Sequence, residues 1–161
     1  MIRTGIGFDI HRFAENRRLV LGGVEIPERP GLEGHSDADV LCHALADALL
    51  GAVGDGDIGV HFPNTDAAWK DACSLALLSA VAERVRGGGW RIVNVDASVL
   101  AERPRIRPYV DAMRTRLAGG MGIGVDQVSV KATTMEQLGA IGRREGIAVM
   151  AVATVERDGP S

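Results

Sequence analysis

A regular alternation near the N-terminus restricts the fold of this chain more than any other feature. Between Gly5 and His11, every second residue is isoleucine or phenylalanine, and the residues between them are glycine, aspartate and histidine. Successive side chains of a β-strand point to opposite faces, so this pattern predicts a half-buried strand. The apolar residues are expected to face the core, which places Asp9 and His11 side by side on the face away from it.

Three other stretches, residues 39–53, 67–86 and 108–120, show apolar residues at helical spacing. Each is expected to form a helix with one face against the core. Cys42 stands at the edge of the apolar stripe of the first of these helices, where it is expected to pack rather than to bind a metal.

Strand-like segments lie between these helices. Residues 18–26 are expected to form a hairpin around a Gly-Gly turn, and residues 93–99 and 128–131 alternate as strands do. The last segment, 146–155, is apolar on both faces, which predicts a central strand or an oligomer interface. This order predicts an α/β (α+β) fold, a mixed β-sheet with helices mainly on one face.

Size and composition narrow the range of functions. The 161 residues contain no linker-like stretch, so a single domain over 1–161 is expected. The net charge of −3 and the pI near 5.8 give no support for a nucleic-acid surface, and no apolar run is long enough to span a membrane. Because Cys42 and Cys73 form no recognisable metal-binding pair and no signal peptide is evident, a reducing cytoplasmic setting is expected.

One further histidine joins the two polar residues of the first strand as a candidate metal ligand. At about 100° per residue, His43 lies nearly opposite the apolar stripe of its predicted helix, in line with Asp39 and Asp47. Two imidazoles and one carboxylate bind zinc while leaving a fourth position open for a substrate. Spacing alone leaves two other interpretations open, namely that Asp9 and His11 form a plain polar strand face and that His43 is an ordinary surface histidine.

Two segments have the composition of anion-binding loops. Residues 54–59 contain three glycines, which let a backbone approach a ligand closely, and Asp66 further on is a candidate helix N-cap. Residues 131–136 combine a cation, two hydroxyls and a strand end, which suits an anion. In the second segment, Thr133 and Glu136 also fit a capping box, so a purely structural role is the alternative.

Taken together, these segments resemble those of one enzyme family, the 2-C-methyl-D-erythritol 2,4-cyclodiphosphate synthases. Five blocks match in order and spacing over essentially the whole chain: GFDIH at 7–11, GHSDAD at 34–39 through His43, DALLG at 47–51, GDIG at 56–59, and VKATT at 130–134 through Gly142 and Arg143. The resemblance implies a homotrimer of subunits that each pack a sheet against helices. It also implies an active site at each interface between subunits.

The resemblance further implies a substrate and its metal ions. The substrate would be 4-diphosphocytidyl-2-C-methyl-D-erythritol 2-phosphate, of the non-mevalonate isoprenoid pathway. Its 2-phosphate attacks the metal-polarised β-phosphate and expels CMP, which yields 2-C-methyl-D-erythritol 2,4-cyclodiphosphate, so the enzyme would be a phosphorus–oxygen lyase. Asp9, His11 and His43 would hold Zn, and Glu136 would place a Mg or Mn ion on the substrate diphosphate.

Residue roles follow from the same resemblance. His35 and Thr134 match positions that the family uses for transition-state stabilisation. Beside the metal ligands Asp9 and His11, the substrate contacts would be His35 and Ser36, and for its methylerythritol portion Asp57, Ile58, Gly59, Phe62, Pro63, Asn64, Thr65 and Asp66. On the cytidine side they would be Ala101, Glu102, Arg103, Pro104, Arg105, Ile106, Arg107, Ala132, Thr133, Thr134, Met135 and Glu136, with Arg143 at the ligand or at a cavity on the trimer axis.

Four residues depart from the family's pattern. Arg105 replaces the usual Lys, which keeps the charge but presents a planar guanidinium to phosphate. Asn64 removes a carboxylate from the expected substrate wall, and Cys73 replaces another Asp. Ala140 replaces a common Phe, which bears on whether an axial cavity would bind isoprenoid diphosphates.

The residues leave two other functions to be tested. A metal-dependent phosphohydrolase is one, since Asp and His sites commonly activate water. A non-catalytic trimeric protein that binds a ligand and uses zinc for stability is the other. The expected partners are the small-molecule cytidine diphosphate substrate and further copies of the chain, with neither nucleic acid nor membrane.

Overall fold

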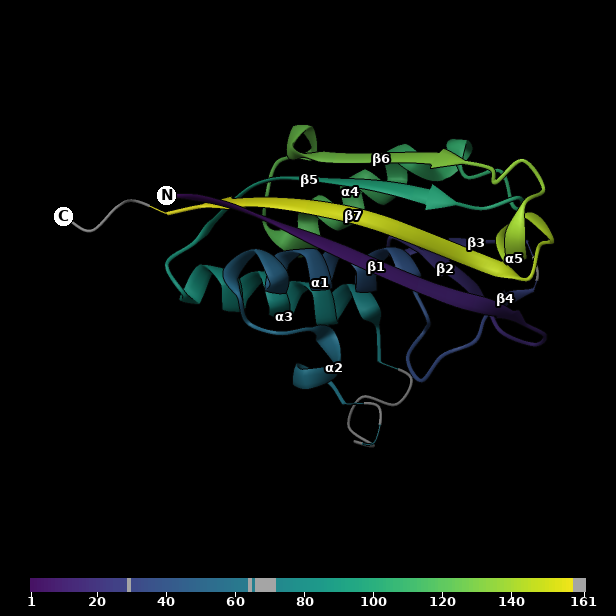
Figure 1. Ribbon diagram of the computed structural model, residues 1–161, viewed down its shortest axis with the longest axis horizontal. Coiled ribbons are helices and arrows are strands. Elements are labelled where there is room, and N and C mark those ends of the chain that lie inside the picture. The colour runs from purple at the N-terminus through teal and green to yellow at the C-terminus, as the bar shows by residue number, and fades with distance from the viewer. Residues whose placement is uncertain (29, 64, 66–71, 158–161) are drawn as a thin grey trace.

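The central feature of the molecule is a mixed β-sheet. A computed structural model describes residues 1–28, 30–63, 65 and 72–157. Its five-stranded sheet has the order β4-β1-β7-β5-β6 (Figure 1). The strands are β1 (Ile2–Ala14), β4 (Gly31–Leu32), β5 (Arg91–Leu100), β6 (Val128–Thr133) and β7 (Gly146–Glu156). β5 and β6 are parallel and the other pairs are antiparallel, so the predicted mixed sheet, with the last strand at its centre, is confirmed.

The three long helices pack in a layer against one face of this sheet (Figure 1). They are α1 (Val40–Val53), α3 (Ser74–Gly87) and α4 (Val110–Met121). α1 lies on β1 and β7, α3 packs on α1 and α4, and α4 contacts β6. Shorter elements are the helices α2 (Ile58–His61) and α5 (Gly139–Gly142), with 3-10 turns at Arg107–Tyr109 and Val125–Gln127. Within the described ranges, no helix combines the length and the apolar character needed to cross a bilayer.

The predicted hairpin is confirmed and is tied to the start of α1. Strands β2 (Leu19–Leu21) and β3 (Val24–Ile26) meet at Gly22 and Gly23, both of which have positive φ, as a tight hairpin turn requires. The backbone N–H groups of these glycines donate to the Asp39 carboxylate over 2.9 and 2.7 Å. Asp39 is fully buried and is also the N-cap of α1. One carboxylate therefore joins the hairpin to the helix.

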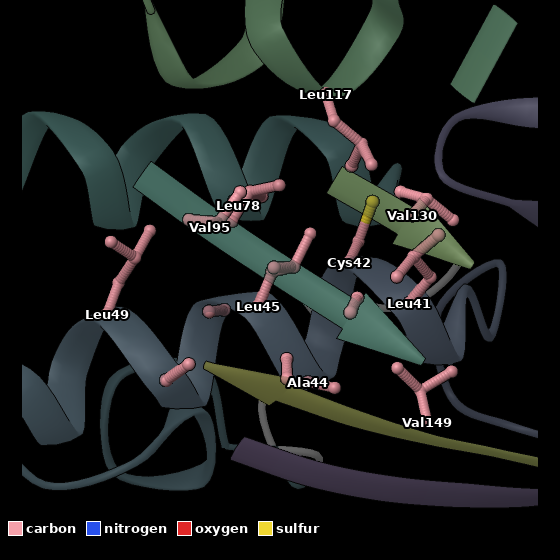
Figure 2. Packing of buried hydrophobic residues seen from close by; sticks show 14 of the residues in the cluster. Leu41, Cys42, Ala44, Leu45, Leu49, Leu78, Val95, Leu117, Val130 and Val149 are labelled. Atoms are coloured by element: carbon pink, nitrogen blue, oxygen red, sulfur yellow. The ribbon is translucent and has the colours of Figure 1, made fainter. Parts of the chain in front are cut away.

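The core lies between the sheet and the helices, and α1 is its centre. The predicted stripe is buried, with Leu41, Leu45 and Leu49 fully excluded from solvent. Figure 2 shows these side chains in one cluster that also contains Val95 of β5 and Leu78 of α3. Burying each leucine contributes about 1.5–3 kcal/mol, so packing rather than helix propensity holds α1 in place. Cys42 packs in this core as predicted, while Cys73 is exposed, and both are free thiols.

The prediction for the faces of β1 is wrong. Ile6, Phe8 and Ile10 are 67%, 54% and 49% exposed, and the opposite face of the strand meets α1. Glycine is the reason: a Cβ on Gly7 would lie 1.9 Å from the carbonyl oxygen of Ala44 in α1. Without side chains here, the strand and helix backbones touch directly. The glycines, with the aspartate and histidine that follow them, therefore face the helix layer.

An apolar surface forms on the outer face of the sheet as a consequence. Phe8 pairs with Met150, and Ile6 pairs with Val152, in the antiparallel register of β1 and β7. Met150 and Val152 are 47% and 40% exposed. We call the set Ile6, Phe8, Ile10, Met150 and Val152 the outer apolar face.

Some helix boundaries differ between the prediction and the structure. The second helix begins at Ser74 rather than at residue 67, and residues 66–71, including the candidate N-cap Asp66, lie outside the described part of the chain. α4 continues through its glycine pair to Met121 and ends at Gly122, whose positive φ closes the helix. β5 contains an irregularity between Ile92 and Asn94, which turns both Ile92 and Val95 toward the core.

Candidate active site

The structure brings the three predicted metal ligands together. Asp9 and His11 come from β1 and His43 comes from α1. Asp9 Oδ2 lies 3.0 Å from His11 Nε2 and 3.0 Å from His43 Nδ1, and the two nitrogens are 3.4 Å apart. A tetrahedral zinc ion with bonds of about 2.0–2.1 Å separates its ligand atoms by about 3.3 Å. These three ligand atoms are therefore of the right type and at the right distances to hold a divalent metal ion.

Hydrogen bonds prepare two of these groups for metal binding. His11 Nδ1 donates to the carbonyl oxygen of Glu33 over 2.5 Å, which leaves the lone pair on Nε2, facing the other ligands. Burial alone would raise the pKa of Asp9, but the adjacent His11 and His43 imidazoles hold it well below its usual range, so Asp9 is ionised. Burial opposes protonation of His11, yet the adjacent Asp9 carboxylate raises the pKa of that imidazole.

A cavity of about 480 Å³ opens beside this group. Many of the residues expected beside the metal and the methylerythritol portion line it, namely Asp9, His11, His35, Ser36, His43, Ile58, Gly59, Phe62 and Pro63. Asp57 is the N-cap of α2, where it accepts a hydrogen bond from Val60 N–H over 3.0 Å. Thr65 is exposed, while Asn64 and Asp66 lie outside the described residues.

Sequence reasoning missed two residues that shape this cavity. Asp47 lines it and accepts the N–H of Ile58 over 2.7 Å, which fixes the start of α2, and burial raises the pKa of this carboxyl. Its position four residues after His43, on the same helix face, was a usable signal. Arg17 donates to the carbonyl oxygens of Gly34 and Ser36, over 3.1 and 2.5 Å, and so supports the loop that carries His35. No sequence pattern pointed to Arg17.

A second cavity, of about 620 Å³, lies at the ends of β5 and β6. Its lining includes most of the residues expected at the cytidine, namely Ala101, Glu102, Pro104, Arg105, Ile106, Arg107, Ala132, Thr133 and Thr134. Arg103 lines a different cavity together with Arg144. Among the described residues, the lining of the second cavity shares no member with that of the first. The two groups of predicted site residues are therefore apart within one chain.

The turn after β6 differs from the expected capping box. No helix starts at Thr134 in the described chain; Thr134 Oγ1 donates to Glu136 Oε1 over 3.0 Å, and both residues are exposed. Glu102 Oε1 accepts the N–H groups of Met135 and Gln137, at 2.9 and 3.2 Å, and holds the turn in place. The Glu136 carboxylate is thus held beside a hydroxyl and caps no helix.

Two predicted contributors lie elsewhere in the single chain. Arg143 is exposed, donates to Glu145 over 2.7 Å, and is absent from the lining of both cavities among the described residues. Lys131, the cation of the candidate anion-binding segment, pairs with Asp96 over 2.5 Å. It therefore contributes to a cross-strand ion pair.

A three-ligand group that could hold a metal ion and that lines a cavity, on an α/β scaffold, is typical of metal-assisted enzymes rather than of closed structural metal sites. Comparison with known protein families identifies a narrower group within this class. The model of the YgbB family matches residues 2–156, so the chain belongs to the YgbB family.

Individual relatives agree with this membership. The chain is 57% identical over 155 residues to the 2-C-methyl-D-erythritol 2,4-cyclodiphosphate synthase of Salinibacter ruber, a match that covers 96% of this chain and 99% of that protein. The bifunctional IspDF from Campylobacter jejuni superposes with a TM-score of 0.94 at 44% identity, over 98% of this chain and 43% of that one. The CDP complex of IspF from Plasmodium falciparum superposes with a TM-score of 0.85 at 32% identity, over 98% of this chain and 97% of that one.

Proposed function

We propose that this chain is a single-domain 2-C-methyl-D-erythritol 2,4-cyclodiphosphate synthase. It cyclises 4-diphosphocytidyl-2-C-methyl-D-erythritol 2-phosphate with release of CMP, as a phosphorus–oxygen lyase of the non-mevalonate isoprenoid pathway. The observation that carries the proposal is the convergence of Asp9, His11 and His43 beside a cavity, in a chain more than half identical to enzymes of this name.

The chemistry explains the types of residue in the site. An oxygen of the 2-phosphate attacks the β-phosphorus, and the bond from that phosphorus to the α-phosphate oxygen breaks, so that CMP leaves with the electron pair. Attacker and leaving group are both anionic, so catalysis requires positive charge and positioned donors. Asp9, His11 and His43 would hold zinc, which supplies positive charge to a phosphate oxygen when bound. Glu136 would serve a magnesium or manganese ion at the diphosphate.

The remaining site residues orient the substrate. His35 is exposed in the first cavity, where it can donate to a phosphate oxygen. Thr134 lines the second cavity, and its hydroxyl would donate to a phosphate oxygen once it leaves the Glu136 carboxylate. Ile58, Gly59 and Phe62 would form the wall for the methylerythritol portion. Arg105 would meet the cytidine diphosphate with a planar fork. Holding the ring-closing oxygen near the phosphorus lowers the barrier, because the encounter no longer costs entropy in the transition state.

We further propose that the chain acts as a homotrimer. Two observations support it. The outer apolar face exposes five large apolar side chains on two adjacent strands, as surfaces that pair with another chain do. The residues that would hold the two ends of one substrate line separate cavities within one chain. In a trimer, the metal ligands of one subunit would face the cytidine cavity of its neighbour. A reducing, cytoplasmic compartment is part of the same proposal, since both cysteines are free thiols.

Product analysis tests the reaction. Purified protein supplied with the cytidylated substrate and a divalent metal should release CMP in equal amount to cyclic diphosphate. Inorganic phosphate as the main product would instead indicate a phosphohydrolase.

A ligand substitution tests whether the site is catalytic. His43→Ala should lose metal and turnover while keeping its oligomeric state, and His61→Ala serves as the matched histidine control, because His61 bonds to the Asp55 carbonyl and lies outside the metal-binding group. Full activity of metal-free His43→Ala would show that the ligand assignment is wrong. A wild-type protein that binds the metal but does not convert the substrate would favour a non-catalytic binding protein.

A further inference from the structure

Two residues behind the metal-binding group have no role in the reaction described so far. We propose that Ser74 and Asp37 hold His43 in the tautomer and orientation that bind the metal, which makes them positioning residues rather than ligands. This inference rests on the proposal that Asp9, His11 and His43 hold a divalent ion. According to this inference, part of the metal affinity of the site depends on the contact between Ser74, at the start of α3, and Asp37, in the loop before α1.

The His43 ring is held at both of its nitrogens. Nδ1 lies 3.0 Å from Asp9 Oδ2, on the side where a metal would bind, and Nε2 lies 2.9 Å from the hydroxyl oxygen of Ser74. Ser74 is 1% exposed, so solvent does not compete for its hydroxyl. The Ser74 hydroxyl bonds in turn to Asp37 Oδ1, and Asp37 Oδ2 accepts the Ser74 N–H over 3.1 Å.

The direction of these hydrogen bonds follows from counting protons. An ionised carboxylate only accepts, so the single hydroxyl proton of Ser74 goes to Asp37. The Ser74 oxygen is then left as an acceptor toward His43, and Nε2 must carry the proton. The Ser36 hydroxyl accepts the Ala38 N–H over 3.1 Å and lies 3.1 Å from the Ser74 oxygen and 3.2 Å from His43 Nε2. Because the Ser74 oxygen has a free lone pair, the Ser36 proton can go to Ser74, and both serine oxygens then face the proton on Nε2. Neutral His43 therefore keeps its lone pair on Nδ1, the atom in the ligand group.

Removal of the serine hydroxyl would favour the opposite tautomer. Asp9 Oδ2, at 3.0 Å, would then accept a hydrogen bond from the N–H at Nδ1 of His43, and a protonated Nδ1 cannot bind a metal. The metal would have to displace that hydrogen bond and reorient the ring. Partners of this kind, which contact a ligand but not the metal, change metal affinity by about 10–100-fold when they are removed.

A purely structural role is the competing explanation. Cys73, the N-cap of α3, makes no side-chain capping bond, and the Asp37 carboxylate accepts the first helical N–H in its place. Loss of that contact would lower the stability of α3 without a specific effect on His43. The experiment must therefore report on the imidazole itself as well as on the fold.

Metal affinity is the first measurement. Zinc binding by competition with a chromophoric chelator should weaken about 10–100-fold in Ser74→Ala. Ser74→Thr, which keeps the hydroxyl, should bind as the wild type does, and so should the control Ser79→Ala, five residues further along α3. If Ser74→Ala does not fold, Ser74→Cys gives the same comparison, because a thiol is only a weak acceptor.

The histidine tautomer is the second measurement, made by ¹⁵N NMR of the metal-free protein about two pH units above the ordinary histidine pKa of about 6.5. We expect His43 to carry its proton on Nε2 in the wild type and to shift toward Nδ1 in Ser74→Ala. Unchanged zinc affinity together with an unchanged tautomer would overturn the inference, even if stability fell. If the wild type bound no zinc, the metal proposal would fail, and the tautomer would still decide the role of Ser74.

Discussion

The direct contact between β1 and α1 predicts a large penalty for one methyl group. In Gly7→Ala, the new Cβ would lie 1.9 Å from Ala44 O and 2.7 Å from Ala48 N, all of them attached to backbone that cannot rotate away. An ordinary carbon–oxygen contact is about 3.3 Å, so the strand and helix would have to separate by about 1.4 Å. Overpacking of this kind costs about 1–3 kcal/mol and occasionally more, and we expect about 3 kcal/mol here.

The same displacement would disturb the metal-binding group. Asp9 is two residues from Gly7 on the strand, and His43 precedes Ala44 on the helix. Metal sites tolerate errors of only about 0.2 Å in ligand distance, so a separation of about 1.4 Å should reduce zinc affinity at least about tenfold. Stability and metal binding should therefore fall together.

Gly51→Ala is the matched control, because it makes the same substitution in α1, the helix that Gly7 of β1 contacts. Its Cβ would meet only the Ile6 carbonyl oxygen, at 3.7 Å, and alanine in a helix interior gains about 0.5–1 kcal/mol over glycine. Urea unfolding of the metal-free proteins at one fixed protomer concentration measures both changes. A Gly7→Ala protein within about 0.5 kcal/mol of the wild type, with normal zinc affinity, would refute the reasoning.

Two further predictions concern assembly and pH. Phe8→Glu places a charge in the outer apolar face, so sedimentation should show a trimer in the wild type and smaller species in the variant; an intact variant trimer would exclude this face as the interface. Acidification should weaken zinc binding: the pKa of His11 is raised above 6.5 in the metal-free site, so protons already compete near neutrality, and affinity should fall up to about tenfold per pH unit below that pKa. Affinity that is constant from pH 7.5 to 5.5 would contradict imidazole coordination.

Periodicity in the sequence was enough to predict most of the fold. The buried stripe of α1, the Gly22–Gly23 hairpin and the central place of β7 were all recovered, because each depends on local spacing. The faces of β1 were assigned wrongly because apolar residues were assumed to face the core. Glycine decided the matter, since a strand without side chains can approach a helix backbone, and this contact is between segments far apart in the sequence.

The candidate site was predictable to the extent that it resembled a known pattern. Asp9, His11 and His43 were identified from residue type and spacing, and the structure places their ligand atoms together. Arg17 and Ser74 could not be found in that way, because each acts through a contact made by the folded chain. The hydrogen bond of Ser74 to His43 joins residues 31 positions apart.

Hydrogen bonds restrain the loop that carries His35 on both sides of this residue. Arg17 bonds to the carbonyl groups of Gly34 and Ser36, and just beyond the loop Asp39 is locked into the hairpin turn and the start of α1. A segment restrained in this way has little freedom left to lose when a ligand arrives. The part of the site around His35 should therefore be preorganised, so that its backbone keeps the same conformation when the substrate binds.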